Sequence, residues 1–307
     1  MTVQQLFTRP PLTYETAVPR SLVHRHSIAE VFLTDSHRGD GPRHFVIAAQ
    51  WPRRHAYFTD SRDGRPTHSI ALFAETLRQT AIYLAHKYHD VALDAHFVMS
   101  EMNIDIEPGG IPAAATDVTI DVDVRDPQFR DGALTRYVVE LTFAIDGRTV
   151  ATGRGAAQVL TPSAYERVRR TASTLALNPA ATRTREESMP TVTPDDTGRD
   201  AGHDVVLAAG TDGLELRIDP GHHIFFDHPC DHVPGMLMLE AVVQAGRVLL
   251  ALPTARAVSV HAAFRKFGEL DRPVGVSGIA PADDHRATVV FHQDGVDIAS
   301  GTVVFAI

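Results

Sequence analysis

Apolar and polar residues alternate over many short stretches of this chain, and apolar residues recur every three to four positions over two longer ones. Alternation predicts β-strands, because successive side chains of a strand point to opposite faces, and the longer spacing predicts helices. In the first half we expect strands at residues 29–33, 44–50, 96–106, 116–124, 134–145 and 148–160. A helix is predicted among them at 67–88, with Thr67 as its N-cap.

The second half repeats this order in a shorter form. Strands are predicted at 205–208, 214–218, 257–267, 274–279, 287–292 and 297–306, with a helix near 234–252. A long apolar helix beside a run of antiparallel strands can bury its apolar side only by lying across the sheet. Each half is therefore predicted to be a layered α+β unit.

Two sequence motifs occur once in each half. The first is a Glu-x-x-x-Gln pair that recurs at an offset of 165 positions: Glu75 and Gln79, then Glu240 and Gln244. The second is Phe-x-x-Asp-Gly-x-x-x-Ala-Thr-Gly at 143–153, which recurs with Ser for Thr 148 positions later. An Asp-Gly pair between alternating apolar residues is a strong signal for a hairpin turn. The chain is therefore predicted to contain two copies of one unit.

The two copies set the predicted domain boundaries. We expect a first domain over residues 20–162 and a second over 204–307. The intervening segment, 163–203, is rich in Thr, Ser, Pro, Asp and Arg and has little apolar periodicity. It is predicted to be an exposed linker.

Composition narrows the class of protein. With 307 residues, of which 44% are hydrophobic and 22% charged, the chain is typical of a globular protein with room for two cores. Its net charge of −9 and its lack of a Lys/Arg block argue against nucleic-acid binding. The sequence indicates neither a secretory signal nor a membrane-spanning helix, so we expect a cytoplasmic protein without membrane contact.

Candidate acid–base chemistry lies at the start of the second helix. Residues 227–236 read Asp-His-Pro-Cys-Asp-His-Val-Pro-Gly-Met, and an apolar helix with Glu240 follows. His228 is the strongest candidate for a general base, because imidazole titrates near neutrality and the Pro-rich turn can hold it at the helix mouth. The amides of Gly235 and Met236 lie in the first turn, where they have no intrahelical partner and can stabilise an oxyanion.

The first helix carries a polar group on one face. Glu75, Arg78 and Gln79 are three and four residues apart, and burying them in so apolar a helix is unfavourable unless they have a role. We predict that Arg78 and Gln79 bind substrate and that Glu75 takes part in catalysis. The second helix has Val243 at the position that matches Arg78.

Simpler interpretations exist for several of these residues. Glu75 and Arg78 could equally form an ion pair on the helix, and Glu240 could bond to the turn before it. Arg53 and Arg54 are candidates for binding a phosphate, although a charged loop is most often only solvated.

Histidines and the single cysteine allow further alternatives. We predict no metal site, because the spacing fits no familiar signature in the cluster of His222, His223, Asp227, His228, Asp231 and His232. His96 and His261, again 165 positions apart, are interpreted as satisfied, partly buried histidines inside strands. Cys230 lies among acidic residues, which disfavour its thiolate and argue against covalent acyl transfer through it.

The two Glu-x-x-x-Gln helices and the Asp-His-Pro-x-Asp-His-Val-Pro-Gly-Met segment resemble the A-factor biosynthesis family of hotdog proteins. The segment is also similar, more remotely, to the β-hydroxyacyl-thioester dehydratases of the hotdog superfamily. The resemblance implies a tandem hotdog fold, with two antiparallel sheets that each wrap a central helix and form a pseudo-dimer. It also implies transfer of a β-ketoacyl group from an acyl carrier protein to the hydroxyl of dihydroxyacetone phosphate, in γ-butyrolactone or butenolide signalling.

The resemblance further implies how the catalytic residues pair. In the dehydratases, the His of one protomer works with the Glu of the other. For a fused pseudo-dimer this pairs His228 with Glu75. Asp60 or His68 would then pair with Glu240 in a second site.

This sequence departs from the family pattern at one position that could contact substrate. The family pattern has an Arg before the Gln of both helices, whereas here Arg78 precedes Gln79 but Val243 precedes Gln244. We expect both glutamines to bind substrate. Because Val243 replaces the family's Arg, we also expect the acyl acceptor to differ from that of the family or to bind differently. The implied partners are an acyl carrier protein and a small phosphorylated acceptor, with no cofactor beyond the carrier's phosphopantetheine arm. A homo-oligomer remains one option.

Two other functions stay open at the level of the sequence. A hotdog acyl-thioester dehydratase or thioesterase needs no phosphate-binding Arg and would tolerate Val243. A non-catalytic acyl-ligand-binding protein would keep the acyl tunnel without turnover.

Overall fold

The computed structural model describes residues 11–61, 64–172, 192–210, 213–281 and 284–306. The first half consists of η1 (Arg20–Val23), η2 (Ile28–Glu30), β1 (Leu33–Arg38), β2 (His44–Trp51), β3 (Thr59–Asp60), β4 (Thr67–His68), α1 (Ile70–His89), β5 (His96–Ile106), β6 (Thr116–Arg130), β7 (Ala133–Ile145) and β8 (Arg148–Leu160). After α2 (Pro162–Ala172), the second half consists of α4 (Pro194–Thr197), η3 (Gly202–Asp204), β9 (Leu207–Gly210), β10 (Gly213–Leu216), α5 (Gly235–Leu250), β11 (Arg256–Phe264), β12 (Gly275–Ile279), β13 (Arg286–Gln293) and β14 (Val296–Ala306).

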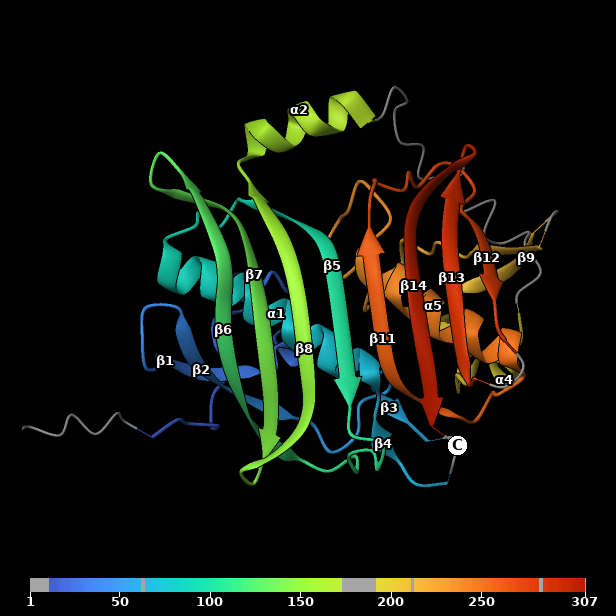
Figure 1. Cartoon of the computed structure of the whole chain (residues 1–307), viewed down its shortest axis with the longest axis horizontal. Helices are drawn as coiled ribbons and strands as arrows, with labels where there is room; N and C mark the ends of the chain where they lie inside the picture. The colour runs from blue at the N-terminus through green and yellow to red at the C-terminus, as the bar shows by residue number, and fades with distance from the viewer. Residues whose placement is uncertain (1–10, 62–63, 173–191, 211–212, 282–283, 307) are drawn as a thin grey trace, which may run out of the picture.

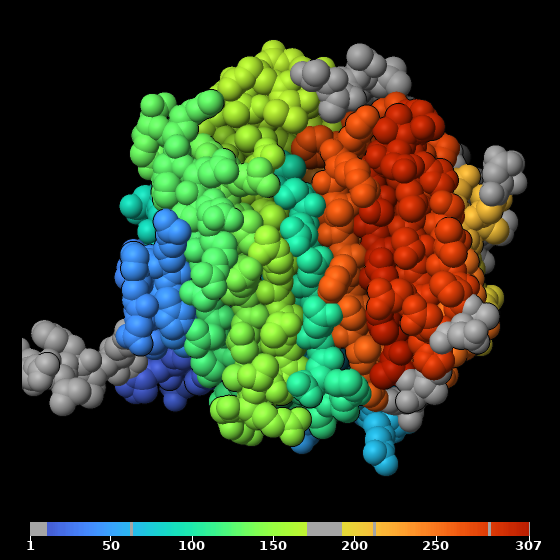
Figure 2. All heavy atoms as spheres, in the orientation of Figure 1, coloured from blue at the N-terminus to red at the C-terminus, as the bar shows by residue number. Residues whose placement is uncertain are grey.

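One antiparallel sheet runs through both halves (Figure 1). Its order is β1-β2-β6-β7-β8-β5-β11-β14-β13-β12-β10-β9, so the first half supplies six neighbouring strands and the second half the other six. The halves meet where β5 pairs with β11, in a register that sets His261 opposite Asn103. Figure 2 shows the atoms of these two strands directly against each other. The predicted α+β architecture is confirmed, with the two antiparallel sheets joined edge to edge.

The long helices α1 and α5 lie on the same face of this sheet (Figure 1). Glycines in the strands allow their close approach, since a Cβ on Gly153 would lie 2.8 Å from Leu77 Cδ1 of α1. At the matching position, a Cβ on Gly301 would lie 2.6 Å from Val242 Cγ2 of α5. The glycine that ends the repeated motif is therefore explained by helix packing. Within the described residues, no helix is long and apolar enough to cross a membrane.

The two predicted Asp-Gly hairpins are confirmed. Asp146 and Gly147 join β7 to β8 with φ of 50° and 75°. Asp294 and Gly295 join β13 to β14 with φ of 53° and 76°. Positive φ at both central residues gives the turn a twist that matches the twist of the strands.

Two local predictions in the first half are wrong. Residues 28–30 form η2, and β1 begins only at Leu33. Thr67 is not the N-cap of α1, because it lies in β4 and pairs with Asp60 of β3. Hydrogen bonding in this short hairpin keeps the backbone extended up to Ser69, which precedes the first residue of α1.

The predicted linker is structured at both ends. On α2, Arg169 donates to Asp231 at 3.0 Å and to Glu269 at 2.8 Å, which ties this helix to the second half. After residue 191, α4 and η3 lead into β9, and Arg199 between them is buried. Both ends of 163–203 are therefore folded onto the second half through Arg169 and Arg199, although many of their residues are exposed as predicted. The remainder of that segment, 173–191, lies outside the described residues.

Candidate active site

Glu75 lies at the centre of a buried charge cluster on α1. Its carboxylate accepts hydrogen bonds from Arg25 Nε and Arg78 Nε, both at 2.9 Å. It also accepts one from Gln79 Nε2 at 2.7 Å. Burial alone would raise the pKa of Glu75, but the charges of Arg25 and Arg78 outweigh it and lower the pKa to about 2. The side chain is therefore a permanent anion that holds two guanidinium groups.

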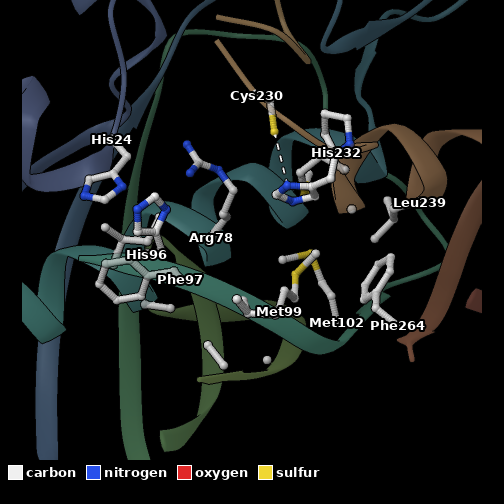
Figure 3. A pocket seen from close by; sticks show the side chains of 18 of the residues that line it. His24, Arg78, His96, Phe97, Met99, Met102, Cys230, His232, Leu239 and Phe264 are labelled. Atoms are coloured by element: carbon white, nitrogen blue, oxygen red, sulfur yellow. Dashed lines mark hydrogen bonds between the residues drawn. The ribbon is translucent and has the colours of Figure 1, made fainter. Parts of the chain in front are cut away.

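Arg78 lines a cavity and has a nitrogen that remains open. Its Nε and Nη2 bind Glu75, and Nη2 also donates to the carbonyl of Val23 at 3.3 Å. Its Nη1 makes no hydrogen bond to any residue that the structure describes. Figure 3 shows the side chain of Arg78 between those of His24 and His96 on one side and those of Cys230 and His232 on the other. A cation fixed on one side and open on the other is suited to an anionic group.

The second half repeats the carboxylate cluster around Glu240. Arg199 Nε donates to Glu240 Oε1 at 2.9 Å, and Gln244 Nε2 donates to the same oxygen at 2.7 Å. Arg199 and its counterpart Arg25 lie 174 positions apart, in the segments that precede each half's first strand. Sequence reasoning missed both arginines. The signal in the sequence is this pair of arginines, whose offset of 174 differs from the offsets of 165 and 148 of the two motifs. A residue-by-residue comparison of the halves could have found it.

Both of these arginines link the two halves. Arg25 Nη1 donates to the backbone carbonyl of Ile224 in the second half at 3.0 Å. Arg199 Nη1 donates to the backbone carbonyl of Tyr57 in the first half at 2.9 Å. Each carboxylate cluster thus extends through its arginine into the opposite half.

Gln79 and Gln244 have matching structural bonds. Besides its donation to Glu75, Gln79 accepts from the amide of Phe32 at 3.0 Å through Oε1. Gln244 accepts from the amide of Val206 at 2.9 Å in the same way. Neither glutamine lines a described cavity. We therefore no longer expect either of them to contact substrate, because their amides are occupied by the protein.

A cavity of about 1440 Å³ lies between the halves. Its polar lining comes from both halves and includes His24, Glu75, Arg78, His96, His228 and Glu240. An apolar part of the wall carries Met99, Met102, Leu239 and Phe264 (Figure 3). A cavity with one apolar wall and a few convergent polar groups is typical of a site for a ligand with a polar head and an apolar chain.

His228 comes to this cavity from the half opposite to Arg78, and it is exposed at the edge. Its Nδ1 lies 3.2 Å from the carbonyl oxygen of Pro229, which places the proton on Nδ1 and leaves Nε2 as an acceptor. Burial lowers the pKa of the imidazole, the contact with Pro229 opposes this, and the charge of Arg78 lowers the pKa further. The ring is therefore neutral near pH 7 and able to accept a proton.

The turn that carries His228 is anchored to the first half. The carboxylate of Asp227 accepts hydrogen bonds from the backbone amides of His26 at 2.6 Å and Ser27 at 3.3 Å. Arg25 Nη1 lies 3.9 Å from the same carboxylate. The position of His228 thus depends on contacts between the halves.

The first turn of α5 faces the same cavity. Gly235 is its first residue, and the amide of Leu237 is the first to bond back to the carbonyl of Pro234, at 3.0 Å. The amides of Gly235 and Met236 come before it, and both residues line the cavity. Their predicted role as oxyanion donors stays a prediction that this placement allows.

The expectation that the thiolate of Cys230 is disfavoured is wrong. Its Sγ lies 3.7 Å from His232 Nδ1, and that ring nitrogen lies 2.8 Å from Asp231 Oδ1. Burial favours the neutral His232 ring, but the bonds to Asp231 and Cys230 raise the pKa of His232 to about 9. Burial likewise raises the pKa of the Cys230 thiol, and the contact with His232 outweighs it and lowers that pKa. The protonated ring of His232 thus lies against the thiol, an orientation that the sequence alone does not indicate.

The Cys230, Asp231 and His232 side chains also bring three potential metal-ligand atoms within 4.8 Å of one another. Protein groups already bind the Asp231 carboxylate, since Tyr165 Oη donates to Oδ1 at 2.6 Å and Arg169 donates to Oδ2 at 3.0 Å. We read this group as the attachment point of α2.

The mouth of the second site is closed. A cavity of about 20 Å³ is lined by Asp60, Glu240, Val243 and Arg247, among others. Arg247 Nη2 donates to Asp60 at 2.8 Å, and Nη1 donates to the carbonyl of Thr197 at 3.1 Å. Arg247 therefore fills the volume that is open beside Arg78 in the first half, and about one water molecule fits in what remains.

Of the two residues predicted to pair with Glu240, only Asp60 lines this small cavity with it. The pairing with His68 is not formed. The ring of His68 is buried against Trp51, with Nε2 3.1 Å from the carbonyl of Ala114, and burial lowers its pKa to about 4.

The remaining candidates lie away from the carboxylates. Arg53 and Arg54 are exposed on the loop after β2 and line neither of the two cavities. His96 lines the large cavity and stacks on Tyr165, with ring centroids 3.9 Å apart. His261 was expected to be partly buried but is exposed, with Nε2 3.0 Å from Asp105.

We expect Arg247→Met to lower the free energy of unfolding by about 3 kcal/mol, because it leaves Asp60 without its main cation in a largely buried place. The acyl transfer that the sequence predicts should be unchanged in the folded protein. Thermal unfolding and a transfer assay measure the two effects. Arg125→Met, which breaks an exposed ion pair with Glu140, is the control and should leave the melting temperature nearly unchanged. Lost transfer in folded Arg247→Met would show that the second mouth is functional.

The fold and the site define a tandem hotdog protein with a large cavity between its two units and a closed one at the matching position. Solved structures agree with this class. An acyl-ACP thioesterase from Bacteroides thetaiotaomicron superposes with a TM-score of 0.52 at 11% identity, over 85% of this chain and 98% of that one. The 12:0-ACP thioesterase from Umbellularia californica gives 0.50 at 10% identity, over 88% and 99%. At these identities the likeness shows the fold alone.

Sequence comparison gives the family. The A-factor biosynthesis hotdog domain model matches residues 7–161 and 180–307. A 2-oxo-3-(phosphooxy)propyl 3-oxoalkanoate synthase of Streptomyces virginiae is 34% identical over 293 residues, covering 93% of this chain and 96% of the relative. A synthase of the same name from Streptomyces coelicolor is 31% identical over 287 residues, covering 91% and 88%. The chain belongs to the A-factor biosynthesis hotdog family, as its motifs predicted.

Proposed function

We propose that this protein is an acyltransferase that moves a β-ketoacyl group from an acyl carrier protein to the hydroxyl of dihydroxyacetone phosphate or a similar small phosphorylated acceptor. The Streptomyces relatives are named as synthases of a phosphooxy-bearing ester of a 3-oxoalkanoate. The observation that carries the proposal is the large cavity, which is lined by Arg78, by His228 and by an apolar wall.

In the proposed reaction, His228 Nε2 accepts the proton of the acceptor hydroxyl, and the hydroxyl oxygen attacks the thioester carbonyl carbon. The amides of Gly235 and Met236 stabilise the negative charge that develops on the carbonyl oxygen. The carbon–sulfur bond then breaks, and the carrier thiol leaves with the proton that His228 returns. Arg78 holds the phosphate of the acceptor through Nη1.

Glu75 has a different role in this scheme from the one its sequence suggested. Its pKa of about 2 and its bonds to Arg25 and Arg78 leave it no proton to exchange near neutral pH. We propose that Glu75 positions Arg78 and does not transfer protons. Glu240 holds Arg199 in the same way at the closed mouth.

Incubating the protein with a β-ketoacyl carrier protein and dihydroxyacetone phosphate, followed by mass spectrometry, tests the function. The expected product is the phosphorylated β-ketoacyl ester. An enoyl product or a free acid would instead identify a dehydratase or a thioesterase. Bound ligand without any product would identify a non-catalytic binding protein.

We expect Arg78→Ala to raise the KM for the acceptor on the order of 10- to 100-fold, because a charge-assisted bond to the phosphate is lost. The fold should survive, since Glu75 keeps its bonds to Arg25 and Gln79. Steady-state kinetics with varied acceptor measures the effect, and the KM for the acyl carrier is the internal control. An unchanged acceptor KM would place the phosphate elsewhere.

A further inference from the structure

His24 and Gly198 occupy matching places in the two halves. Each is the C-cap of a short helix: its amide bonds back to Arg20 in η1 and to Pro194 in α4. Each is followed by the arginine that binds the buried carboxylate of its half. Both adopt the left-handed conformation, with φ of 50° at His24 and 71° at Gly198. The two halves therefore share one backbone path here but differ in side chain.

The left-handed conformation is unfavourable for a residue with a Cβ and ordinary for glycine. In the second half, glycine is also required by space, because a Cβ on Gly198 would lie 2.6 Å from the carbonyl oxygen of Pro253. It would also lie 2.8 Å from Nη1 of Arg247, the side chain that closes that mouth. In the first half, the same place holds His24 at the wall of the large cavity. A strained residue beside a cavity points to a role for its side chain.

Hydrogen bonding fixes the protons of the His24 ring. His86 Nδ1 lies 2.8 Å from the carbonyl oxygen of Val91, which only accepts, so the proton of His86 is on Nδ1. His86 Nε2 is then an acceptor, and His24 Nε2, at 2.9 Å, donates to it. The other ring nitrogen of His24, Nδ1, consequently carries a lone pair. It has no hydrogen-bond partner among the residues that the structure describes.

The surroundings keep both rings neutral. Burial lowers the pKa of His24 to about 3, and the neighbouring His86 and Arg78 contribute to this. Burial also lowers the pKa of His86. Phe97 packs edge-on against both rings, with centroid distances of 5.3 Å each, which fixes their orientation. The other charged or titratable groups that act on His24 are His96 and His228. His24 thus adds a neutral hydrogen-bond acceptor to the lining of the cavity to which Arg78 contributes a cation.

We infer that His24 helps to bind the acyl acceptor: before attack, its Nδ1 accepts the hydrogen bond of the hydroxyl of a small phosphorylated alcohol while Arg78 holds the phosphate. The hydroxyl then turns its single proton to His228 Nε2 when it attacks. This inference rests on the proposed function and adds the residue that recognises the hydroxyl. A neutral ring nitrogen accepts from a hydroxyl and attracts no second anion, whereas Arg78 supplies the positive charge. The two side chains together select a ligand that carries both groups.

Direct binding tests this inference separately from catalysis. Calorimetry without acyl carrier should show that the protein binds dihydroxyacetone phosphate on the order of 10-fold more tightly than hydroxyacetone phosphate, which lacks the hydroxyl. His24→Gly, which copies the second half, should bind the two phosphates equally. Its melting temperature should be unchanged or higher, because glycine relieves the left-handed backbone. His24→Asn tolerates the same backbone and offers an acceptor oxygen, so it should recover part of the preference.

Equal binding of the two phosphates by the unmodified protein would overturn the inference, as would an unchanged preference in folded His24→Gly. Failure to bind either phosphate would overturn it as well. The proposed function has its own outcome, because a protein that discriminates between the phosphates but forms no ester would retain the His24 role and lose the transferase assignment.

Discussion

Replacing His228 by Ala is expected to lower the rate of acyl transfer by on the order of 10²–10⁴-fold, because its ring is the proposed general base and the contact with Pro229 leaves Nε2 as an acceptor. The exposed ring of His228 contributes little packing, so the melting temperature should change little. Turnover of a β-ketoacyl carrier with saturating acceptor gives the rate, and thermal unfolding gives the stability.

His26→Ala is the matched control for this substitution. His26 is exposed, its ring lies 6.1 Å from that of His228, and it does not line the large cavity. Its loss removes a neighbouring imidazole without removing the proposed base, so transfer should continue at the normal rate. If His228→Ala is folded and retains near-normal activity, the base has to be sought elsewhere in the cavity.

Glu75→Gln and Glu240→Gln form a second, matched pair. Each should lower the free energy of unfolding by about 3–5 kcal/mol, because each leaves buried arginine charge without its carboxylate. Only Glu75→Gln should also raise the acceptor KM, since Arg78 loses its anchor. Denaturant unfolding and steady-state kinetics separate the two effects. Equal kinetic losses in both variants would mean that the closed mouth takes part in turnover.

Acid stability gives an independent readout for Glu75. Its pKa in the folded protein is about 2, below the ordinary value of 4.5. A carboxylate with a lowered pKa contributes stability above its unfolded value, and that contribution is lost as the pH falls through the folded value. The free energy of unfolding should therefore decrease between about pH 4.5 and pH 2, and this part of the decrease should be absent in Glu75→Gln.

Much of the fold follows from repetition in the sequence. The hairpin motif that starts at Phe143 predicted two turns correctly, because an Asp-Gly pair encodes its own backbone conformation. The α1 and α5 helices were predicted from apolar spacing and lie near the expected positions. The predicted start of the helix at Thr67 was wrong, since a hairpin made with residues outside the helix decides where α1 begins.

The site was harder to predict, because its contacts join distant segments. Arg25 binds Glu75 across 50 positions, and Arg199 binds Glu240 across 41. No local pattern marks either arginine, and Arg199 lay in a segment whose composition is typical of a linker. The wrong expectation for the Cys230 thiolate has another cause, which is the orientation of a side chain only two positions away. Chain neighbours predicted an acidic surrounding, whereas the folded turn places His232 against the thiol.

The covalent joining of the two hotdog units has an evolutionary consequence. In a dimer of identical subunits, a substitution in one active site appears in the other as well, so the pair can only change together. In this chain each half can accumulate its own substitutions. Arg247 closes one mouth, while Arg78 stays open to the large cavity. In the proposed mechanism, the half with the closed mouth supplies His228 and the oxyanion amides to its neighbour. If the proposed mechanism holds, fusion has converted two equivalent catalytic centres into a division of labour, in which one site turns over and the other half supports it.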